Sequence, residues 1–192
     1  MTGATMYYFL CASLPTPVFG VESRLTRAAF DRCCEAAMEP EDFAKLTSGR
    51  LAAPRSPDCA SGQYGIYGEY AKFEQYLRTR IAERRLNGGD EKLPTPIEFY
   101  GEIDRGLAQL AQEPPAERER MIDLLRWKRL DELEAGHEFD LDKLCVLRLK
   151  FELLDKYRNR DAAAGRENFN AAVDRISGAA PGSETTSTSQ EL

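Results

Sequence analysis

The sequence predicts an all-α protein, an irregular multi-helix bundle of about six or seven helices. Apolar residues recur three and four positions apart in every periodic segment, and no segment alternates apolar and polar residues as a half-buried strand does. We expect one helical domain over residues 1–176, divided into an N-terminal part (6–62), middle helices (63–113) and a C-terminal helical hairpin with a last helix (114–176). Residues 177–192 are rich in Ser, Thr and Gly and are expected to form a disordered tail.

The N-terminal part begins with an apolar segment, Tyr7–Ser13, that is too short for its periodicity to decide between a strand and a helix. A helix is favoured because no other segment offers a strand partner, and a lone strand leaves its backbone groups unpaired. Thr26 is the expected N-cap of the next helix, and Pro40 the expected first residue of a short third one. Thr47–Gly62 holds several Gly, Pro, Ser and Ala residues and should be an irregular connection.

The longest helical pattern of the chain spans Tyr64–Leu86. Its charged residues, Glu74 and Arg80 among them, take the faces that are not apolar. After it, Thr95–Glu98 forms a capping box with proline at the first helical position, which predicts the start of another helix. The apolar face of the long helix comprises Ile66, Tyr70, Phe73, Leu77 and Ile81.

The segment Trp127–Asp155 predicts two helices joined by a tight turn, and it holds the only tryptophan and the only histidine. Gly136 should end the first helix, because glycine enters the left-handed conformation without steric cost. Asp140 should cap the second helix, in which Leu144 and Phe151 belong to the inward-facing apolar positions. A short last helix is expected over Arg166–Ile176, with Phe169, Val173 and Ile176 on one side.

Composition and charge exclude several classes of protein. A net charge of −6 and a pI near 5.1 argue against nucleic acid or an anionic membrane surface as the main partner. A bilayer-spanning helix needs about 20 consecutive apolar residues, and the sequence has no such run, so direct membrane insertion is not expected. The apolar segment Met6–Leu14 lacks the preceding basic residues of a signal peptide. Five cysteines, odd in number and unevenly spaced, fit reduced thiols in the cytoplasm.

Only one place in the sequence could carry metal or acid–base chemistry. His137 lies among acidic residues, which permits a metal site, but no second histidine or cysteine pair is near. The favoured interpretation is that Asp140 and Asp142 stabilise the start of the next helix and that His137 bonds to the backbone at the turn. Cys33 and Cys34 are interpreted as small apolar residues on a buried helix face. There is no phosphate-binding GxxxxGK[ST] and no GxSxG, so no catalytic, cofactor or metal site is expected.

Two stretches of the chain carry a resemblance to a known family. They are Tyr7–Pro15 with Phe19-Gly20, and Leu130–Leu144 (LDELEAGHEFDLDKL). Both resemble a small family of bacterial proteins of unassigned function, whose members are typically encoded among the subunits of a V-type (A/V-type) proton or sodium ATPase. Cys11 and Glu138 depart from the family's pattern, which has an aliphatic and an aromatic residue there. The N-terminal segment is also similar, more weakly, to the start of the all-helical C (d-type) subunit, which sits between rotor ring and central stalk.

The resemblance implies a non-catalytic, peripheral component of a V-type ATPase, and the weaker similarity implies a C-subunit-like connector. Its partners would be other ATPase subunits, and its location cytoplasmic, peripheral to the inner membrane through the complex. The binding surface is expected around the hairpin Trp127–Asp155 and the N-terminal segment, which carry the resemblance, and the expected partner-binding residues are Trp127, Asp131, His137, Glu138 and Asp140. Two alternatives remain, a free-standing helical adaptor and a small metal-dependent enzyme centred on His137; gene neighbourhood tests the first and metal analysis the second.

Overall fold

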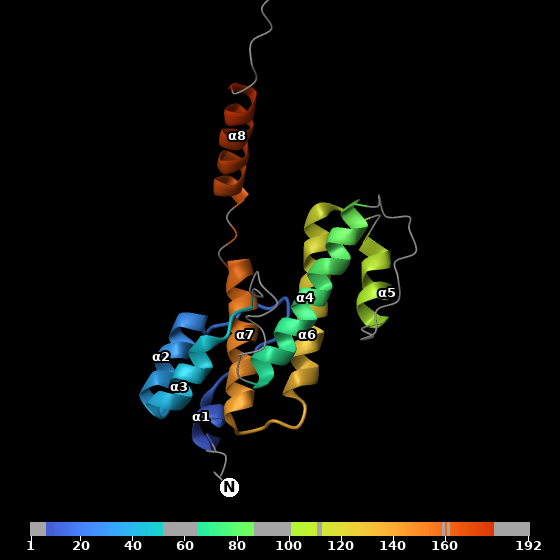
Figure 1. The fold of residues 1–192 in the computed structure, drawn as a ribbon. Coiled ribbons are helices and arrows are strands. Elements are labelled where there is room, and N and C mark those ends of the chain that lie inside the picture. The colour runs from blue at the N-terminus through green and yellow to red at the C-terminus, as the bar shows by residue number, and fades with distance from the viewer. Residues whose placement is uncertain are drawn as a thin grey trace, which may run out of the picture. The chain divides into compact units, whose positions relative to one another are not determined.

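The computed structural model describes residues 7–51, 65–86, 101–110, 113–158, 160 and 162–178. Within these ranges the chain forms eight helices and no strand, which confirms the all-α prediction with one or two more helices than expected (Figure 1). The segment that periodicity left undecided is helical. The helices are α1 (Tyr8–Ser13), α2 (Arg27–Ala37), α3 (Pro40–Ser48), α4 (Gly65–Leu86), α5 (Gly101–Gln109), α6 (Pro115–Glu134), α7 (Leu141–Arg158) and α8 (Ala162–Gly178).

Contacts divide the chain into two compact units, Met1–Arg158 and Asn159–Leu192, where the sequence analysis expected one domain through residue 176. The described part of the second unit is essentially α8, which is longer than the expected last helix and includes Ser177 and Gly178. Its large apolar side chains Phe169 and Val173 are 67% and 42% exposed. The rest of the expected tail lies outside the described residues.

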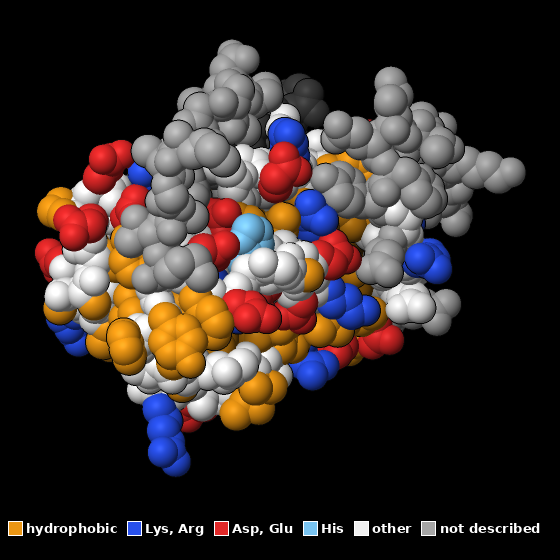
Figure 2. Space-filling model, turned by 90° about the horizontal axis from the view of Figure 1, so that it is seen from below, with side chains coloured by type: hydrophobic (Ala, Val, Ile, Leu, Met, Phe, Trp, Pro, Cys, Tyr) orange, Lys and Arg blue, Asp and Glu red, His pale blue; other side chains and the backbone are white. Residues whose placement is uncertain are grey.

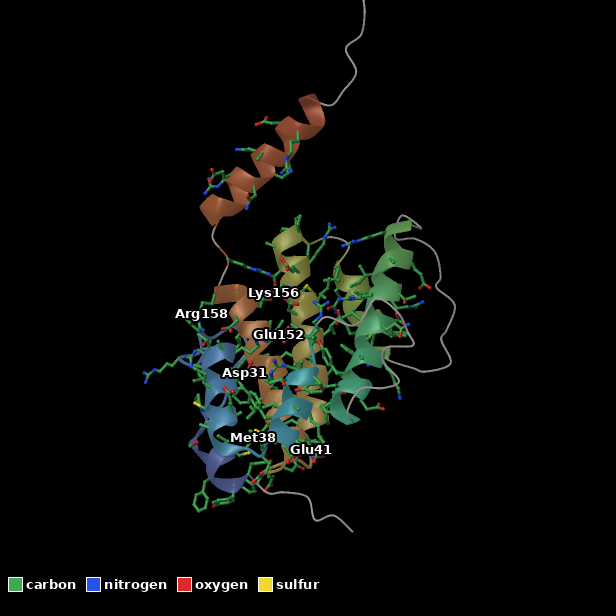
Figure 3. All side chains as sticks on the ribbon, turned by 60° about the vertical axis from the view of Figure 1, so that its left-hand side comes forward. Asp31, Met38, Glu41, Glu152, Lys156 and Arg158 are labelled. Carbon is green, nitrogen blue, oxygen red and sulfur yellow. The ribbon has the colours of Figure 1, made fainter. Side chains whose placement is uncertain are left out.

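Helix α7 is the centre of the first unit and contacts α2, α3, α4 and α6. Leu144 and Phe151 are fully buried, as expected for its inward positions. Two charged residues of α7 are buried as well. The Arg148 guanidinium donates to Asp31 of α2 (Nε to Oδ1, 2.8 Å), which faces α7 in Figure 3, and to the Gly49 carbonyl (2.8 Å). Lys150 donates to Asp131 and Glu134 of α6, so each buried cation has an anionic partner.

The helix ends carry the caps that local chemistry predicts. Thr26 Oγ1 accepts a hydrogen bond from Ala29 N (3.1 Å) at the start of α2, and Asp140 Oδ1 accepts from Lys143 N (2.9 Å) at the start of α7. Gly136 has φ +89° and follows the end of α6, which confirms its predicted role. Pro40 is the first residue of α3. The predicted capping box at Thr95–Glu98 lies outside the described residues.

Glycine at position 49 is required by packing. A Cβ atom there would lie 2.2 Å from the ring of Tyr67, so any larger residue forces the ring to move. The buried Tyr67 hydroxyl donates to the Leu46 carbonyl (2.6 Å), and this bond joins the end of α3 to α4.

A buried network of charged residues joins α4, α6 and α7. Arg126 donates to both carboxylate oxygens of Glu74 (2.8 and 2.7 Å) and to Asp123 (2.7 Å), and Asp123 also accepts from Lys156 and Tyr157 (both 2.8 Å). Glu74 and Asp123 are 1% and 0% exposed. Placing Glu74 and Arg80 on faces away from the core was therefore wrong for both, because their partners lie on other helices that periodicity cannot reveal.

The cysteines divide by burial. Cys34 is buried, and burial raises the pKa of its thiol to about 12; Cys145 is buried with the same result. Cys33 is exposed, so the interpretation that both adjacent cysteines face the core is wrong for Cys33. No described helix is both long and apolar enough to cross a bilayer.

Candidate partner-binding surface at α1 and the α6–α7 turn

The structure brings together the two stretches that carry the family resemblance. Tyr7 N donates to the Phe139 carbonyl (2.5 Å), and the ring of Tyr8 packs on the ring of Phe139 with centroids 4.6 Å apart. Tyr7 and the start of α1 therefore lie directly against the turn that joins α6 to α7. We call the surface they form the aromatic–acidic face: Tyr8, Phe9, His137, Glu138 and Phe139.

Two large aromatic side chains of this face point to solvent. Phe9 is 87% exposed and Tyr8 is 54% exposed, and their rings meet edge to face at 5.7 Å. Figure 2 shows the single histidine, pale blue, among red carboxylates, with orange hydrophobic side chains on the same side of the molecule. Exposed aromatic residues beside charged ones are typical of protein–protein interfaces.

The neighbouring residue Tyr7 holds α1 in place. Its side chain is buried, and its hydroxyl donates to Asp42 Oδ2 of α3 (2.6 Å). The hydrogen bond from Tyr7, supported by the hydrogen bond and charge of Lys45, outweighs burial and holds the pKa of Asp42 below its usual value. The two exposed rings thus stand on a helix that is fixed both to α3 and to the α6–α7 turn.

The turn itself is organised by Asp140. Its Oδ1 caps α7, and its Oδ2 lies 2.6 Å from His137 Nδ1. Burial disfavours the charged form of Asp140, but the hydrogen bonds from His137 and Lys143 N outweigh burial and keep its pKa below the usual value. The backbone N–H of His137 donates to the Glu134 carbonyl (3.0 Å). The imidazole ring was expected to bond to the backbone, but it pairs with the carboxylate of Asp140 instead. Glu138 is exposed.

One metal-ligating arrangement is present among the described residues. His137, Asp140 and Asp142 can each offer a ligand atom, and these atoms lie within 4.8 Å of one another. Ligand atoms about 2.1 Å from a tetrahedral zinc ion are roughly 3.4 Å apart. The 2.6 Å contact of His137 with Asp140 is a hydrogen-bond distance, so a cation could enter only if these two side chains moved apart.

Trp127 and Asp131 lie away from the turn. Trp127 is 7% exposed and packs against Phe19 (ring centroids 5.5 Å apart), and it precedes the end of α6 by seven residues, roughly 10 Å along the helix. Lys150 Nζ lies 5.2 Å from the Trp127 ring centroid and donates to Asp131 (2.5 Å). These two expected binding residues therefore gather around Lys150, and no hydrogen bond or ring contact of theirs with His137, Glu138 or Asp140 is among those described.

Sequence reasoning did not include Tyr8, Phe9 and Phe139 among the partner-binding residues. All three stand in the stretches that carry the resemblance, and the N-terminal segment was expected in the binding surface, but no residue of it was named because an apolar segment is normally interpreted as core. The usable signal was three successive aromatic residues, Tyr7–Phe9, on a helix of only six residues, because so short a helix cannot bury all three on one face.

Comparison with known proteins gives a similarity to one family and no activity. Residues 89–179 match the family described as "Protein of unknown function (DUF2764)". The match covers slightly less than half of the chain and includes the α6–α7 turn but not α1, so the chain is similar to a family of unassigned function. The comparisons with curated proteins and with solved structures gave no match.

Proposed function

We propose that this chain is a non-catalytic, peripheral component of a V-type proton or sodium ATPase, and that it binds another subunit through the aromatic–acidic face. The observation that carries the binding site is the contact of Tyr7 and Tyr8 with Phe139, which joins two segments about 130 residues apart into one exposed surface. The choice of the ATPase rests on the resemblance of these same two segments. The match to a family of unassigned function is compatible with it and names no partner.

The chemistry of the face defines the partner surface that fits it. Tyr and Phe side chains bury about 150–250 Å² each when covered, so Tyr8 and Phe9 can fill an apolar pocket. Glu138 and the nearby Asp142 favour basic residues around that pocket, and such charges act mainly on the association rate and on specificity. The proposed partner surface is therefore an apolar pocket with a basic rim.

A finer proposal assigns the chain to the place of the C-type subunit, between rotor ring and central stalk, in the cytoplasm and peripheral to the inner membrane. The weaker similarity of the N-terminal segment supports it. A connector needs helices that do not slide past one another. The buried ion pairs from α7 to α2 and α6, together with the Glu74–Arg126 pair between α4 and α6, supply that rigidity.

Affinity purification of the ATPase from detergent-solubilised membranes tests the proposal. We expect the wild-type chain to co-purify with the complex, Phe9→Ser to reduce its recovery at least about fivefold, and Phe169→Ser to leave it unchanged. Phe169 is a matched control, since it is also a highly exposed phenylalanine but belongs to α8. Absence of the wild-type chain from the complex rejects the ATPase proposal, and equal recovery of both variants rejects the face.

A divalent-cation site is the second candidate, favoured by the cluster of His137, Asp140 and Asp142. It corresponds to the alternative of a small metal-dependent enzyme. Metal analysis of the purified chain decides it: a stoichiometric metal that is lost in His137→Ala supports the site, and a metal content equal in both proteins rejects it.

A further inference from the structure

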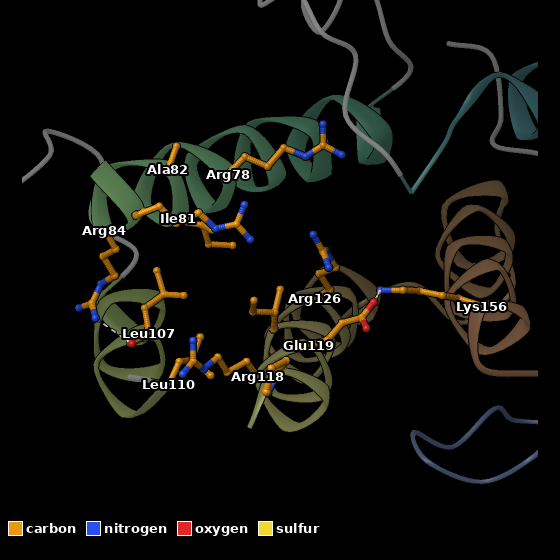
Figure 4. Close-up of a pocket in the computed structure, with 13 residues that line it drawn as sticks. Arg78, Ile81, Ala82, Arg84, Leu107, Leu110, Arg118, Glu119, Arg126 and Lys156 are labelled. Atoms are coloured by element: carbon orange, nitrogen blue, oxygen red, sulfur yellow. Dashed lines mark hydrogen bonds and ion pairs between the residues drawn. The ribbon is translucent and has the colours of Figure 1, made fainter. Parts of the chain in front are cut away.

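A cleft lies on the first unit, between α4, α5 and α6, and it plays no part in the aromatic–acidic face. Its volume is about 1120 Å³. Figure 4 shows α4 along one side and α6 along the other, with α5 near one end and Lys156 of α7 reaching in from the opposite end.

The lining of this cleft is basic although the protein is acidic. Six of the thirteen lining residues are Arg or Lys, and Glu119 is the one acidic residue among them. The chain as a whole carries a net charge of −6, and three of the cations pair with carboxylates at the cleft wall: Arg78 and Arg126 with Glu74, and Lys156 with Asp123 and Glu119. No carboxylate among the described residues pairs with Arg84 or Arg85, so the positive charge that a ligand can use lies at the end of α4. The basic residues are Arg78, Arg84, Arg85, Arg118, Arg126 and Lys156.

The positive charge of Arg84 is not fully compensated by other groups among the described residues. Its Nη1 donates to the carbonyl oxygen of Leu107 (2.8 Å), which is a neutral acceptor. Its Nε is buried and has no hydrogen-bond partner among the described residues. A buried donor without an acceptor is unfavourable, and a ligand carboxylate that reached Arg84 would relieve this cost. Arg85, the next residue, is exposed.

The remaining lining is largely apolar. Ile81 of α4, Leu107 and Leu110 at α5, and Ile122 of α6 contribute side chains to the same cleft. A ligand that fits must therefore present apolar groups and several negative charges together. An amphipathic helix with leucine-like residues on one face and acidic residues beside them has this pattern.

We propose that this cleft binds an acidic amphipathic helix of a partner protein. A helix about 10 Å wide with a rise of 1.5 Å per residue occupies roughly 120 Å³ per residue, so the cleft holds about nine residues, or two to three turns. A bilayer surface cannot enter a recess between three helices, and the acidic remainder of the chain repels an extended polyanion such as nucleic acid. The inference stands whether or not the chain belongs to an ATPase.

Fluorescence anisotropy of the full chain tests this proposal. The probe is a fluorescein-labelled peptide of about fourteen Leu, Ala and Glu residues, with the leucines on one helical face. Its control has the same composition in an order that destroys that face. The cleft variant combines Arg85→Glu and Arg118→Glu, which are exposed residues of the cleft lining. Its matched control combines Arg32→Glu and Arg50→Glu, which are also exposed, change the charge equally and do not line the cleft.

The proposal expects saturable binding of the helical peptide that weakens at least about fivefold for the reordered peptide and at least about fivefold for the cleft variant. The Arg32/Arg50 variant should bind within about twofold of wild type, and both proteins should keep the wild-type circular dichroism. No binding, or binding indifferent to peptide order or to the cleft variant, overturns the proposal. Three further results would also overturn it, because each would assign the cleft to a different occupant. They are the loss, in the cleft variant alone, of binding to phosphatidylserine vesicles, of binding to a single-stranded oligonucleotide, or of concentration-dependent self-association in sedimentation.

Discussion

The aromatic–acidic face and the basic cleft belong to the same compact unit but are assembled in different ways. The face is formed by two short segments whose backbones are hydrogen-bonded to each other, and most of its residues stand in stretches that drew attention in the sequence. The cleft is formed by single residues of four helices, spread from Arg78 to Lys156. A surface made of contiguous segments can be found by reading the chain, whereas a surface made of scattered residues emerges only from helix packing.

The two regions also differ in how their charges are held. At the turn, acidic residues cap a helix and stay near solvent, so their contributions should be small and sensitive to salt. Behind the cleft wall, Glu74 and Asp123 are buried and fully engaged by Arg126, Lys156 and Tyr157. Loss of one buried partner leaves the others uncompensated, so this wall should respond far more strongly to mutation.

The largest effect is expected in α7, which supports both regions. Leu144→Ala or Phe151→Ala should lower the free energy of unfolding by about 2–5 kcal/mol, because both side chains are fully buried. Arg118→Ala or Glu119→Ala should stay within about 0.5 kcal/mol, since both residues are exposed and the ion pair of Glu119 with Lys156 lies at the surface. Urea denaturation measures all four. The reverse ranking would show that the helix faces are assigned wrongly.

The next effect concerns the buried network behind the cleft. Asp123→Ala should cost about 3 kcal/mol at neutral pH, because it leaves Arg126 and Lys156 without a carboxylate that each now pairs with. Arg120→Ala is the control, since Arg120 is an exposed residue of the same helix. Thermal and urea unfolding measure both. A cost below about 1 kcal/mol would show that Asp123 contributes little to the stabilising effect of the network.

The same residue predicts a pH dependence. Burial disfavours ionisation of Asp123, but hydrogen bonds from Lys156, Tyr157 and Arg126 outweigh it and hold its pKa below the usual value. A depressed pKa gives stability that is complete above the unfolded-state pKa, about 3.9, and is lost as the pH falls through the folded-state pKa. The stability difference between wild type and Asp123→Asn should therefore be constant above about pH 5 and shrink below about pH 4. A difference that grows on acidification contradicts this assignment.

A smaller effect is expected at the turn. Asp140→Ala removes the N-cap of α7 and should cost about 1 kcal/mol. Asp142→Ala is the matched control: it lies in the first turn of the same helix but makes no cap hydrogen bond among those described, so it should cost less than half as much. Urea denaturation separates the two variants, and equal costs would mean that the cap contributes nothing beyond its charge.

These contrasts show what the sequence could and could not predict. The helices, the Thr26 and Asp140 caps and the Gly136 turn follow from local chemistry within a few residues, and all were predicted. The burial of Glu74 and Arg80 was missed, because the energy that permits it comes from Arg126 and Asp104 on other helices. The basic cleft was missed for the same reason: its lining residues come from four helices, and only the packing of these helices shows which residues lie beside one another.

The smallest change in stability is expected for the double variant His137→Ala with Glu138→Lys, and it is the sharpest test of the difference between the two regions. Neither side chain is buried, and the cap hydrogen bond that Lys143 N donates to Asp140 Oδ1 does not involve them, so the free energy of unfolding should change by less than about 0.5 kcal/mol. The variant nevertheless alters the charge of the aromatic–acidic face at its centre. If a basic partner surface meets this face, association with the ATPase complex should weaken at low salt, and the loss should diminish as salt screens the wild-type attraction. Because the basic cleft is untouched, binding of the acidic helical peptide should stay as in wild type. Normal co-purification at low salt, with an unchanged circular dichroism spectrum, would remove the turn from the interface and leave Tyr8 and Phe9 as the residues to test.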